Sequence, residues 1–398
     1  MYTSMFRKAM LGDTATLNLD FTTGVLDSRL TFTRAANTAT YINSSGYVTT
    51  AAANTPRFDY DPVTLAPRGL LIEGSAINLM TYSEDQGNNS TWNAYSTSVT
   101  RTTGQTDPEN TTTATKILFD ATSADAVISR SVTISNATAY TISVWMRADS
   151  GTVSNVRFGR AAAASGAIFP TLTTTWQRVQ LAFTSSGTSD GIEIRVLTSG
   201  SPKTATIHIW GAQLEAGSGA SSYIPTVASQ VTRNPDYCQS TVASGIAGWL
   251  TSLTTSTYFV DFVPMTQRGA FANTWNTRTS TFQGYEIYCF DGTAGVNLTC
   301  TTKISASTNV ETNVASGLAL NSRHKIAYSI SAGSGLRSVN GSTASAANPV
   351  ALPTGTPSTF GVGSGGGGSG TSINAWIRSV KYYPTALTQT EINGMTAA

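Results

Sequence analysis

Short segments in which apolar and polar residues alternate dominate this chain, and helical periodicity is almost absent. Glycine, asparagine, serine and proline bound these segments, which is typical of strands joined by tight turns. Residues 140–147 and 177–184 are clear examples, because every second side chain is apolar and one face of each strand can be buried. The pattern predicts an all-β protein whose main domains are β-sandwiches.

The composition supports this fold class and excludes several kinds of partner. Charged residues make up 12% of the 398, against roughly 25% in average globular proteins. Threonine, which is abundant, favours strands, and the 40% of apolar residues suffice for real cores. A net charge of +2 gives no electrostatic case for nucleic acid, and no apolar run approaches the about 18 residues of a membrane helix.

The chain is too long for one sandwich, so we expect several domains. Residues 1–80 are predicted to form a small N-terminal β adaptor, in which residues 43–46 turn a hairpin. A jelly-roll sandwich is predicted over 81–226, a linker over 227–235 and a second sandwich over 236–398. Within the first sandwich the predicted strands are 114–119, 126–134, 140–147, 153–159, 177–184, 191–197 and 205–214. Thr388 and Glu391 have capping-box spacing for a short helix near the C-terminal end.

A long motif near the N-terminus carries a resemblance to a known family. It reads TFTRAANTATYI over 31–42, NTPRFDYDP over 54–62 and GLLIE over 69–73, and it closes with NLM and YS over 78–83. This motif resembles the N-terminal signature of tailed-bacteriophage virion appendages of the tail-fibre or head-fibre type. Further along, YTISVWMRA, TWQRV and IWGAQLE resemble jelly-roll carbohydrate-binding modules, and KIAYSI followed by VNG resembles laminin-G or concanavalin-like sandwiches.

The resemblance implies a structural component of a phage particle that binds host-surface glycans during attachment. Its partners would be other phage structural proteins, further copies of itself, most often as a trimer, and host cell-surface polysaccharide. The implied location is the virion, after assembly in the host cytoplasm, which agrees with a start that lacks a signal-peptide core. Capsid decoration or a collar role without sugar binding is the alternative, and a polysaccharide depolymerase is a third hypothesis.

Signals for an enzyme are poor, so we expect no catalytic residues. His208 and His324 are the only histidines, and they fall in different predicted domains, so each is interpreted as structural. No metalloprotease, nucleophile-elbow or phosphate-loop spacing occurs. The acidic residues are scattered and form no evident pair for glycoside hydrolysis.

Candidate glycan contacts are aromatic residues in loop-like, asparagine-rich surroundings, since an aromatic ring can pack on the apolar face of a sugar. These are Trp92, Tyr95 and Trp275. Trp92 has an alternative interpretation as a residue that simply caps the jelly roll. Four further tryptophans lie within strand patterns and are predicted to pack in cores: Trp145, Trp176, Trp210 and Trp376.

Neither a cofactor nor a metal site is predicted. Calcium is possible in folds of this kind, and Asp120 and Asp261 are conceivable donors, but no ligand spacing supports a site. The cysteines Cys238, Cys289 and Cys300 form no metal motif, and Cys289 and Cys300 could face each other across a hairpin, as free thiols or as a disulfide.

Rare charges in the N-terminal region are expected to fix its shape. Arg34, Arg57 and Glu73 stand out in a segment with few other charged residues. Burial with an opposite charge would give them a structural role, and binding of a partner by one of them is the alternative.

Overall fold

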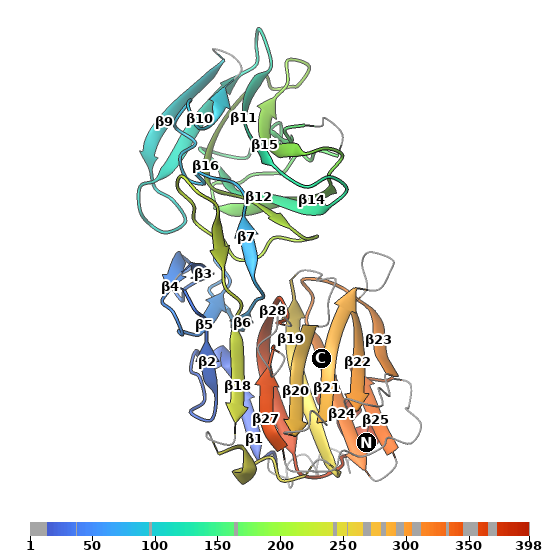
Figure 1. Cartoon of the computed structure of the whole chain (residues 1–398). Helices are drawn as coiled ribbons and strands as arrows, with labels where there is room; N and C mark the ends of the chain where they lie inside the picture. Colours follow the sequence, from blue (N-terminus) through green and yellow to red (C-terminus); the bar gives the residue numbers. More distant parts are fainter. Residues whose placement is uncertain are drawn as a thin grey trace. The chain divides into compact units, whose positions relative to one another are not determined.

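The computed structural model confirms the predicted all-β fold class: strands form nearly all of the regular structure (Figure 1). It describes residues 14–36, 38–94, 98–162, 166–241, 245–252, 254–265, 272–279, 284–291, 298–304, 312–331, 334–344, 357–364 and 372–397. Within 272–279, 284–291, 298–304 and 312–317 the description covers the backbone only. No helix in these ranges has the length and apolar character needed to cross a membrane.

The chain divides into two compact units that do not follow the three consecutive regions expected from the sequence. Unit 1 comprises residues 1–34, 67–74 and 236–398, and unit 2 comprises 35–66 and 75–235. The N-terminal segment is therefore shared between the units. The reason is strand pairing, because β1 (Leu17–Asp20) and β6 (Pro67–Ile72) both pair with β28 (Ala375–Tyr383) near the C-terminal end.

Unit 1 contains two sheets. In the first sheet β1 and β6 follow one another along one edge of β28, while β19 lies along its other edge, and the order continues to β24, β25 and β26. The second sheet has the order β2-β18-β27-β20-β21-β22-β23. The remaining elements of unit 1 are β2 (Thr31–Thr33), β18 (Tyr237–Thr241), β19 (Ser256–Pro264), β20 (Ala272–Thr279), β21 (Gly284–Asp291), β22 (Leu298–Ile304), β23 (Thr312–Leu318), β24 (His324–Ser331), β25 (Ser334–Val339), β26 (Ser342–Thr343), β27 (Pro357–Val362), α2 (Gln389–Thr396) and the 3₁₀ turns η1 (Phe21–Thr23) and η3 (Ile246–Gly248).

Aromatic packing fills the core of unit 1. The ring of Trp249 lies 5.1 Å from that of Phe360 in β27 and 6.1 Å from that of Tyr382 in β28, so it links the two sheets. Helix α2 covers part of the opposite face of the first sheet, where Ile392 is buried beside Phe259. Its predicted capping box is present, since Thr388 and Glu391 exchange side-chain and backbone hydrogen bonds.

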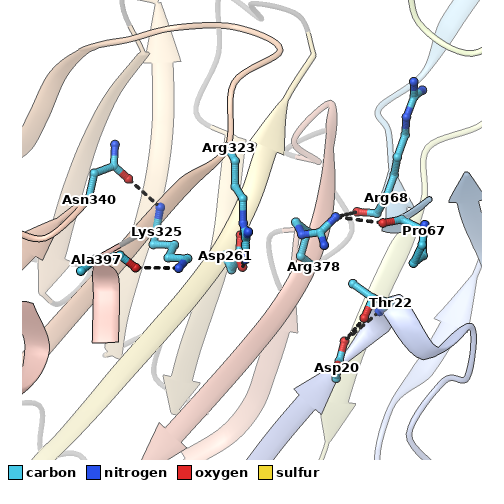
Figure 2. Close-up of polar contacts among 10 residues, drawn as sticks. All are labelled: Asp20, Thr22, Pro67, Arg68, Asp261, Arg323, Lys325, Asn340, Arg378 and Ala397. Atoms are coloured by element: carbon cyan, nitrogen blue, oxygen red, sulfur yellow. Dashed lines mark hydrogen bonds and ion pairs between the residues drawn. The ribbon is translucent and has the colours of Figure 1, made fainter. Parts of the chain in front are cut away.

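Gly69 lets β6 pass close to a bulge in β28, where Arg378 and Ser379 together oppose Asp261. Its φ is +111°, and an added Cβ would lie 2.4 Å from the carbonyl oxygen of Ile377. The Arg378 guanidinium reaches back to the carbonyl of Pro67 at 2.9 Å (Figure 2).

We expect Gly69→Ala to destabilise unit 1 by about 2 kcal/mol or more, because it combines a strained φ with a backbone clash. Denaturant unfolding monitored by tryptophan fluorescence measures the loss. Gly104→Ala is the matched control, since Gly104 also has a positive φ (+73°) but its Cβ would meet nothing within 4 Å. An equal loss of unfolding free energy in the two variants would show that the close approach of β6 to β28 does not add to the cost of a side chain at Gly69.

The rare charges of the N-terminal region are buried and structural, as expected. Arg34 donates to Asp236 at 3.0 Å, and both side chains are fully buried. Asp236 also accepts from the backbone N–H of Glu73 at 2.9 Å, so it joins three segments of unit 1. Arg57 lies in unit 2, where it donates to the carbonyl of Thr40 and to the Ser222 hydroxyl.

Unit 2 is a sandwich of a five-stranded sheet, β14-β12-β16-β10-β9, and a four-stranded sheet, β13-β15-β11-β8 (Figure 1). Its strands are β3 (Ala39–Ile42), β4 (Val48–Ala51), β5 (Arg57–Tyr60), β7 (Ala76–Asn78), β8 (Asn93–Ala94), β9 (Val99–Gln105), β10 (Ala114–Asp120), β11 (Ala126–Thr133), β12 (Ala139–Ala148), β13 (Arg157–Arg160), β14 (Gln177–Thr184), β15 (Ser189–Val196), β16 (Thr204–Ala216) and β17 (Val231–Arg233). The predicted hairpin over 43–46 joins β3 to β4, and β7 pairs with β17. The core between the two large sheets contains alternate residues of β12, namely Ile142, Val144 and Met146.

Candidate functional site

The outer face of the five-stranded sheet carries a cluster of polar and aromatic side chains. Because Ile142, Val144 and Met146 point into the core, Trp145 and Arg147 point to the opposite face. The strand registers place Lys116 of β10 opposite His208 of β16, and His208 opposite Arg147 of β12. Residues from three strands that are far apart in the sequence therefore form one row on this face.

Trp176, which precedes β14, ends this row with a half-buried ring. The Arg147 guanidinium carbon lies 5.3 Å from the centre of the Trp176 ring, within the range of a cation–π contact. The ring also meets the His208 imidazole edge to face, at 6.3 Å between centroids. These contacts fix the orientation of the indole while part of its surface stays in contact with solvent.

His208 and Asp149 supply the polar part of the cluster. His208 Nε2 lies 2.8 Å from an Asp149 carboxylate oxygen, and its Nδ1 lies 3.3 Å from an Arg147 nitrogen. Because a guanidinium only donates, Nδ1 accepts and Nε2 carries the proton that is donated to Asp149. Lys116 Nζ lies 3.5 Å from the other Asp149 oxygen.

The environment sets the charges of these groups. Burial lowers the pKa of His208, so the imidazole is neutral at pH 7. The hydrogen bond from His208 holds the pKa of Asp149 below its usual value, so this carboxylate stays ionised. The site thus offers an ionised carboxylate, a guanidinium and an ammonium group around an indole ring.

The neighbouring row adds hydroxyl groups and one apolar side chain. Thr100, Leu118 and Thr206 face the same way, since the registers pair Leu118 with both threonines. Leu118 is 40% exposed, which makes it one of the more exposed large apolar side chains among the described residues. We call Trp176, Arg147, His208, Asp149, Lys116 and Leu118 the outer-face site.

Another part of this sheet face is covered by the protein itself. Trp145 and Trp210 are buried there in a small cluster with Ile42 and Tyr223, and the Trp210 and Tyr223 rings are 4.6 Å apart. Trp210 also donates to the Thr113 hydroxyl at 2.7 Å. The segment around β3 thus closes one half of the sheet face and leaves the outer-face site at its border.

Two of the four tryptophans predicted to pack in cores do so completely. Trp145 and Trp210 are 6% and 0% exposed. Trp176 and Trp376 are only half-buried, because each lies on the outer face of its sheet or at its border. Trp176 was therefore not among the candidate contacts predicted from the sequence. A signal for this site is present in the alternation along 142–147. Because Ile142, Val144 and Met146 face the core, Trp145 and Arg147 must lie on the outer face, where Arg147 meets Trp176.

The predicted glycan contacts have different outcomes. Trp92 is fully buried in the sandwich core, and its indole N–H donates to the Tyr82 carbonyl at 3.1 Å. The expectation of an exposed ring at this position is corrected, since its apolar body contributes more by filling the core. Tyr95 lies outside the described residues. Trp275 lies in β20, where its backbone pairs with Val362 and Ile287, and its side chain lies outside the described part.

The other candidate residues are placed as follows. His324 is buried, with its ring nitrogens near the carbonyl of Ala319 and the side chain of Asn340, which agrees with a structural role. Asp261 is paired with Arg323. Within the described ranges no group of three or more His, Cys, Asp or Glu side chains is arranged to hold a metal ion. Cys289 and Cys300 are direct cross-strand partners in the backbone register of β21 and β22.

Glu109 is a titrating group elsewhere in unit 2. Its burial, together with the charges of Glu84 and Asp107, raises its pKa to about 7. Since the folded value exceeds the usual 4.5, the folded state binds this proton more tightly than the unfolded chain does. The stability that the group contributes is full below pH 4.5 and is lost as the pH rises through 7.

We therefore expect the free energy of unfolding of Glu109→Gln, relative to that of the wild type, to be higher at pH 8 than at pH 5. After allowance for solvent screening, this relative gain is about 1 kcal/mol. Chemical denaturation at both pH values measures the two free energies of unfolding. A difference between variant and wild type that does not change with pH would contradict the raised pKa.

Comparison with known proteins agrees with the fold of unit 2. Residues 78–204 match the family described as Carbohydrate binding domain. The match covers the sandwich of unit 2 as far as the start of β16, and it includes Lys116, Arg147, Asp149 and Trp176. Among curated proteins no match was found.

Several solved structures align with part of the chain at low sequence identity. A carbohydrate-binding module, CBM40, of the Ruminococcus gnavus IT-sialidase bound to α2,3-sialyllactose is 12% identical over 38% of this chain and 87% of its own, with a TM-score of 0.32. Domain 4 of a GH43 extracellular arabinanase from Geobacillus stearothermophilus, in complex with arabinotriose, is 13% identical over 45% and 82%, with a TM-score of 0.32. A SAP-like pentraxin from Limulus polyphemus is 15% identical over 36% and 70%, with a TM-score of 0.31.

Proposed function

We propose that this protein binds glycans through the outer-face site of unit 2 and does so as an appendage of a tailed-phage particle. The observation that carries the first part is the half-buried Trp176 ring, held by Arg147 and His208 beside the part of the sheet face that the protein itself covers. The family match over residues 78–204 supports the same class of ligand.

The chemistry of the site suits a sugar. A pyranose presents an apolar C–H face that can pack on an indole, and its hydroxyls both donate and accept hydrogen bonds. The Asp149 carboxylate is an acceptor for such hydroxyls, while Arg147 and Lys116 are donors. Leu118 and the threonines of β9 would extend the contact along the sheet to a second sugar unit.

Weak binding at one site is enough for this role. A site with one exposed ring and a few polar groups buries little surface, so we expect a dissociation constant of about 0.1–1 mM for a single site. Several copies on one particle would raise the avidity by about 10² to 10⁴ without any new contact. A trimeric appendage that binds a repeating host-surface polysaccharide would gain avidity in this way.

The proposed place on a virus particle is supported by the N-terminal motif. The motif segments 31–42, 54–62 and 69–73 contain β2, β3, β5 and most of β6. Strands β2 and β6 belong to unit 1 and β3 and β5 to unit 2, so the motif is part of the architecture of both units and not a detached tag. Immunogold labelling of particles released from a lysed host culture tests the location. Labelled particles would support the proposal, and label confined to the particle-free fraction would contradict it.

The binding proposal is tested with the full chain on an array of neutral and acidic oligosaccharides, followed by calorimetric titration of those bound. We expect saturable binding that periodate oxidation of the glycan abolishes, since oxidation destroys vicinal hydroxyls. Absence of binding across the array, with the protein folded and oligomeric as isolated, would reject a glycan-binding role and favour a purely architectural one.

A further inference from the structure

The outer face of the first sheet of unit 1 carries a concentration of positive charge in a chain that has little charge overall. Cationic side chains on this face come from three strands and an adjoining turn: Arg68, Arg323, Lys325, Arg378 and Lys381 (Figure 2 shows four of them). The carboxylates on the described part of the same face are Asp20 and Asp261. Positive charge therefore exceeds negative charge here, although the whole chain carries only +2.

The strand registers show that these residues share one face. Lys325 of β24 is the cross-strand partner of Asp261 of β19, which in turn faces Ser379 of β28, and Ser379 faces Asp20 of β1. Lys381 is the partner of Phe259, whose ring lies with helix α2 on the outer side of the sheet. Arg378 belongs to the bulge that opposes Asp261, so it also stands on this side.

Most of these cations are held in position by the fold. Arg323 makes a two-pronged ion pair with Asp261, and its side chain is still 52% exposed. The Lys325 ammonium donates to the carbonyl of Ala397 at 2.7 Å (Figure 2). The Arg68 guanidinium lies 4.7 Å from the centre of the Trp376 ring, which keeps it extended over the sheet. An anionic ligand would therefore meet cations that have already lost much of their rotamer freedom.

We propose that this basic face binds an acidic polysaccharide, one that carries carboxylates at intervals along an otherwise uncharged sugar chain. The inference goes beyond the outer-face site of unit 2 and does not depend on it. Lys325 of β24 and Lys381 of β28 stand two strand spacings apart across the sheet, about 10 Å, and are offset by two residues along it, about 7 Å. The resulting separation of about 12 Å is on the scale of the repeat of a polymer with one carboxylate on every second sugar. The bulge at Arg378 and the partly exposed Trp376 add guanidinium and aromatic surface further along β28.

Charge density separates this ligand from nucleic acid. Duplex DNA carries one charge per about 1.7 Å of its axis and calls for a dense track of cations. Here two carboxylates interrupt the positive charge, and one of them, Asp261, is already paired with Arg323. Spaced carboxylates with hydroxyls between them fit this alternation better, because the hydroxyls can donate to the exposed Asp20 carboxylate.

The test is a titration of the full chain with hyaluronan, alginate and polygalacturonate oligosaccharides, with an uncharged dextran oligosaccharide as the neutral probe. We expect binding of at least one acidic probe, weakening as salt rises because salt screens the attraction between the partly exposed cations and the carboxylates of the probe. The double variant Lys325→Gln with Lys381→Gln is expected to bind it about tenfold more weakly. Lys203→Gln, an exposed lysine of unit 2, is the charge control and is expected to bind like the wild type.

Each result decides the inference. Loss of acidic-probe binding in the double variant, with Trp176→Ala unaffected, supports the basic face even if unit 2 binds no glycan at all. Unchanged binding in a double variant whose melting curve matches the wild type overturns it, as does loss on Trp176→Ala alone. Equal or tighter binding of a DNA duplex to the same face overturns the assignment to polysaccharide.

Discussion

Replacement of Trp176 by alanine is expected to weaken glycan binding by at least tenfold while leaving the protein folded. The indole is the one large ring of the outer-face site, and burying an aromatic side chain against a ligand contributes about 1.5–3 kcal/mol. A loss of 1.4 kcal/mol corresponds to tenfold in the dissociation constant. Calorimetric titration of wild type and variant with the tightest oligosaccharide from the array measures the change.

Phe169→Ala provides the matched control. Phe169 is also an exposed aromatic residue of unit 2, at 54% exposure, but it lies in the connection between β13 and β14, beside the bridge from Ile168 to Phe158. It is therefore expected to leave binding unchanged. If the two variants bind alike, the ligand does not contact Trp176 and the outer-face site is misplaced.

Replacement of Asp236 by alanine is expected to have the largest effect on stability, about 3–5 kcal/mol. The change leaves the Arg34 guanidinium buried without its carboxylate, and a buried charge that loses its partner is costly. It also removes the acceptor of the Glu73 backbone N–H, so the segment that joins β6 to the rest of unit 1 loses its anchor. Urea unfolding of the full chain gives the free energy.

An exposed ion pair of the same chemistry is the comparison for that variant. Asp27 and Arg29 are 2.6 Å apart, with roughly 30% of each side chain exposed. Asp27→Ala is expected to cost at most about 1 kcal/mol, because solvent screens such a pair. Comparable losses in the two variants would mean that burial does not set the energy of the Arg34–Asp236 pair.

The sequence was sufficient to predict most strands of the unit 2 sandwich, because each of those strands has its own alternation of apolar and polar residues. The predicted 114–119, 126–134, 177–184 and 205–214 correspond to β10, β11, β14 and β16 within a few residues. Strand β9 was missed, since its Val-Thr-Arg-Thr-Thr-Gly-Gln run has almost no apolar face and pairs only at the sheet edge. Local composition thus predicted the buried strands better than the exposed one.

The division into units could not be predicted in the same way. The alternation of Leu17 and Leu19 predicts a strand at β1 (Leu17–Asp20). Nothing in the sequence of these four residues indicates that Leu17 and Leu19 pair with Tyr382 and Val380. Such long-range pairing depends on the whole fold, since many strand edges offer the same backbone groups. An N-terminal segment that reads as a separate adaptor is therefore divided between the two units.

The candidate site shows why residue type alone misleads. Trp92 lies among asparagines, and yet the fold turns its ring into the core. Trp176 lies beside a strand with a regular apolar pattern, and yet its ring ends up beside Arg147 on the outer face. Identification of the site needed the cross-strand registers that bring Lys116, His208 and Arg147 into one row.

Oxidative footprinting of tryptophan side chains, with and without a saturating oligosaccharide, directly tests whether glycans bind at the outer-face site. Trp176 and Trp376 are both half-buried, so both are expected to react in the free protein, and each serves as the reference for the other. A neutral oligosaccharide is expected to protect Trp176 and to leave the reactivity of Trp376 unchanged. Bound oligosaccharide with Trp176 as reactive as before would contradict glycan binding at the outer-face site.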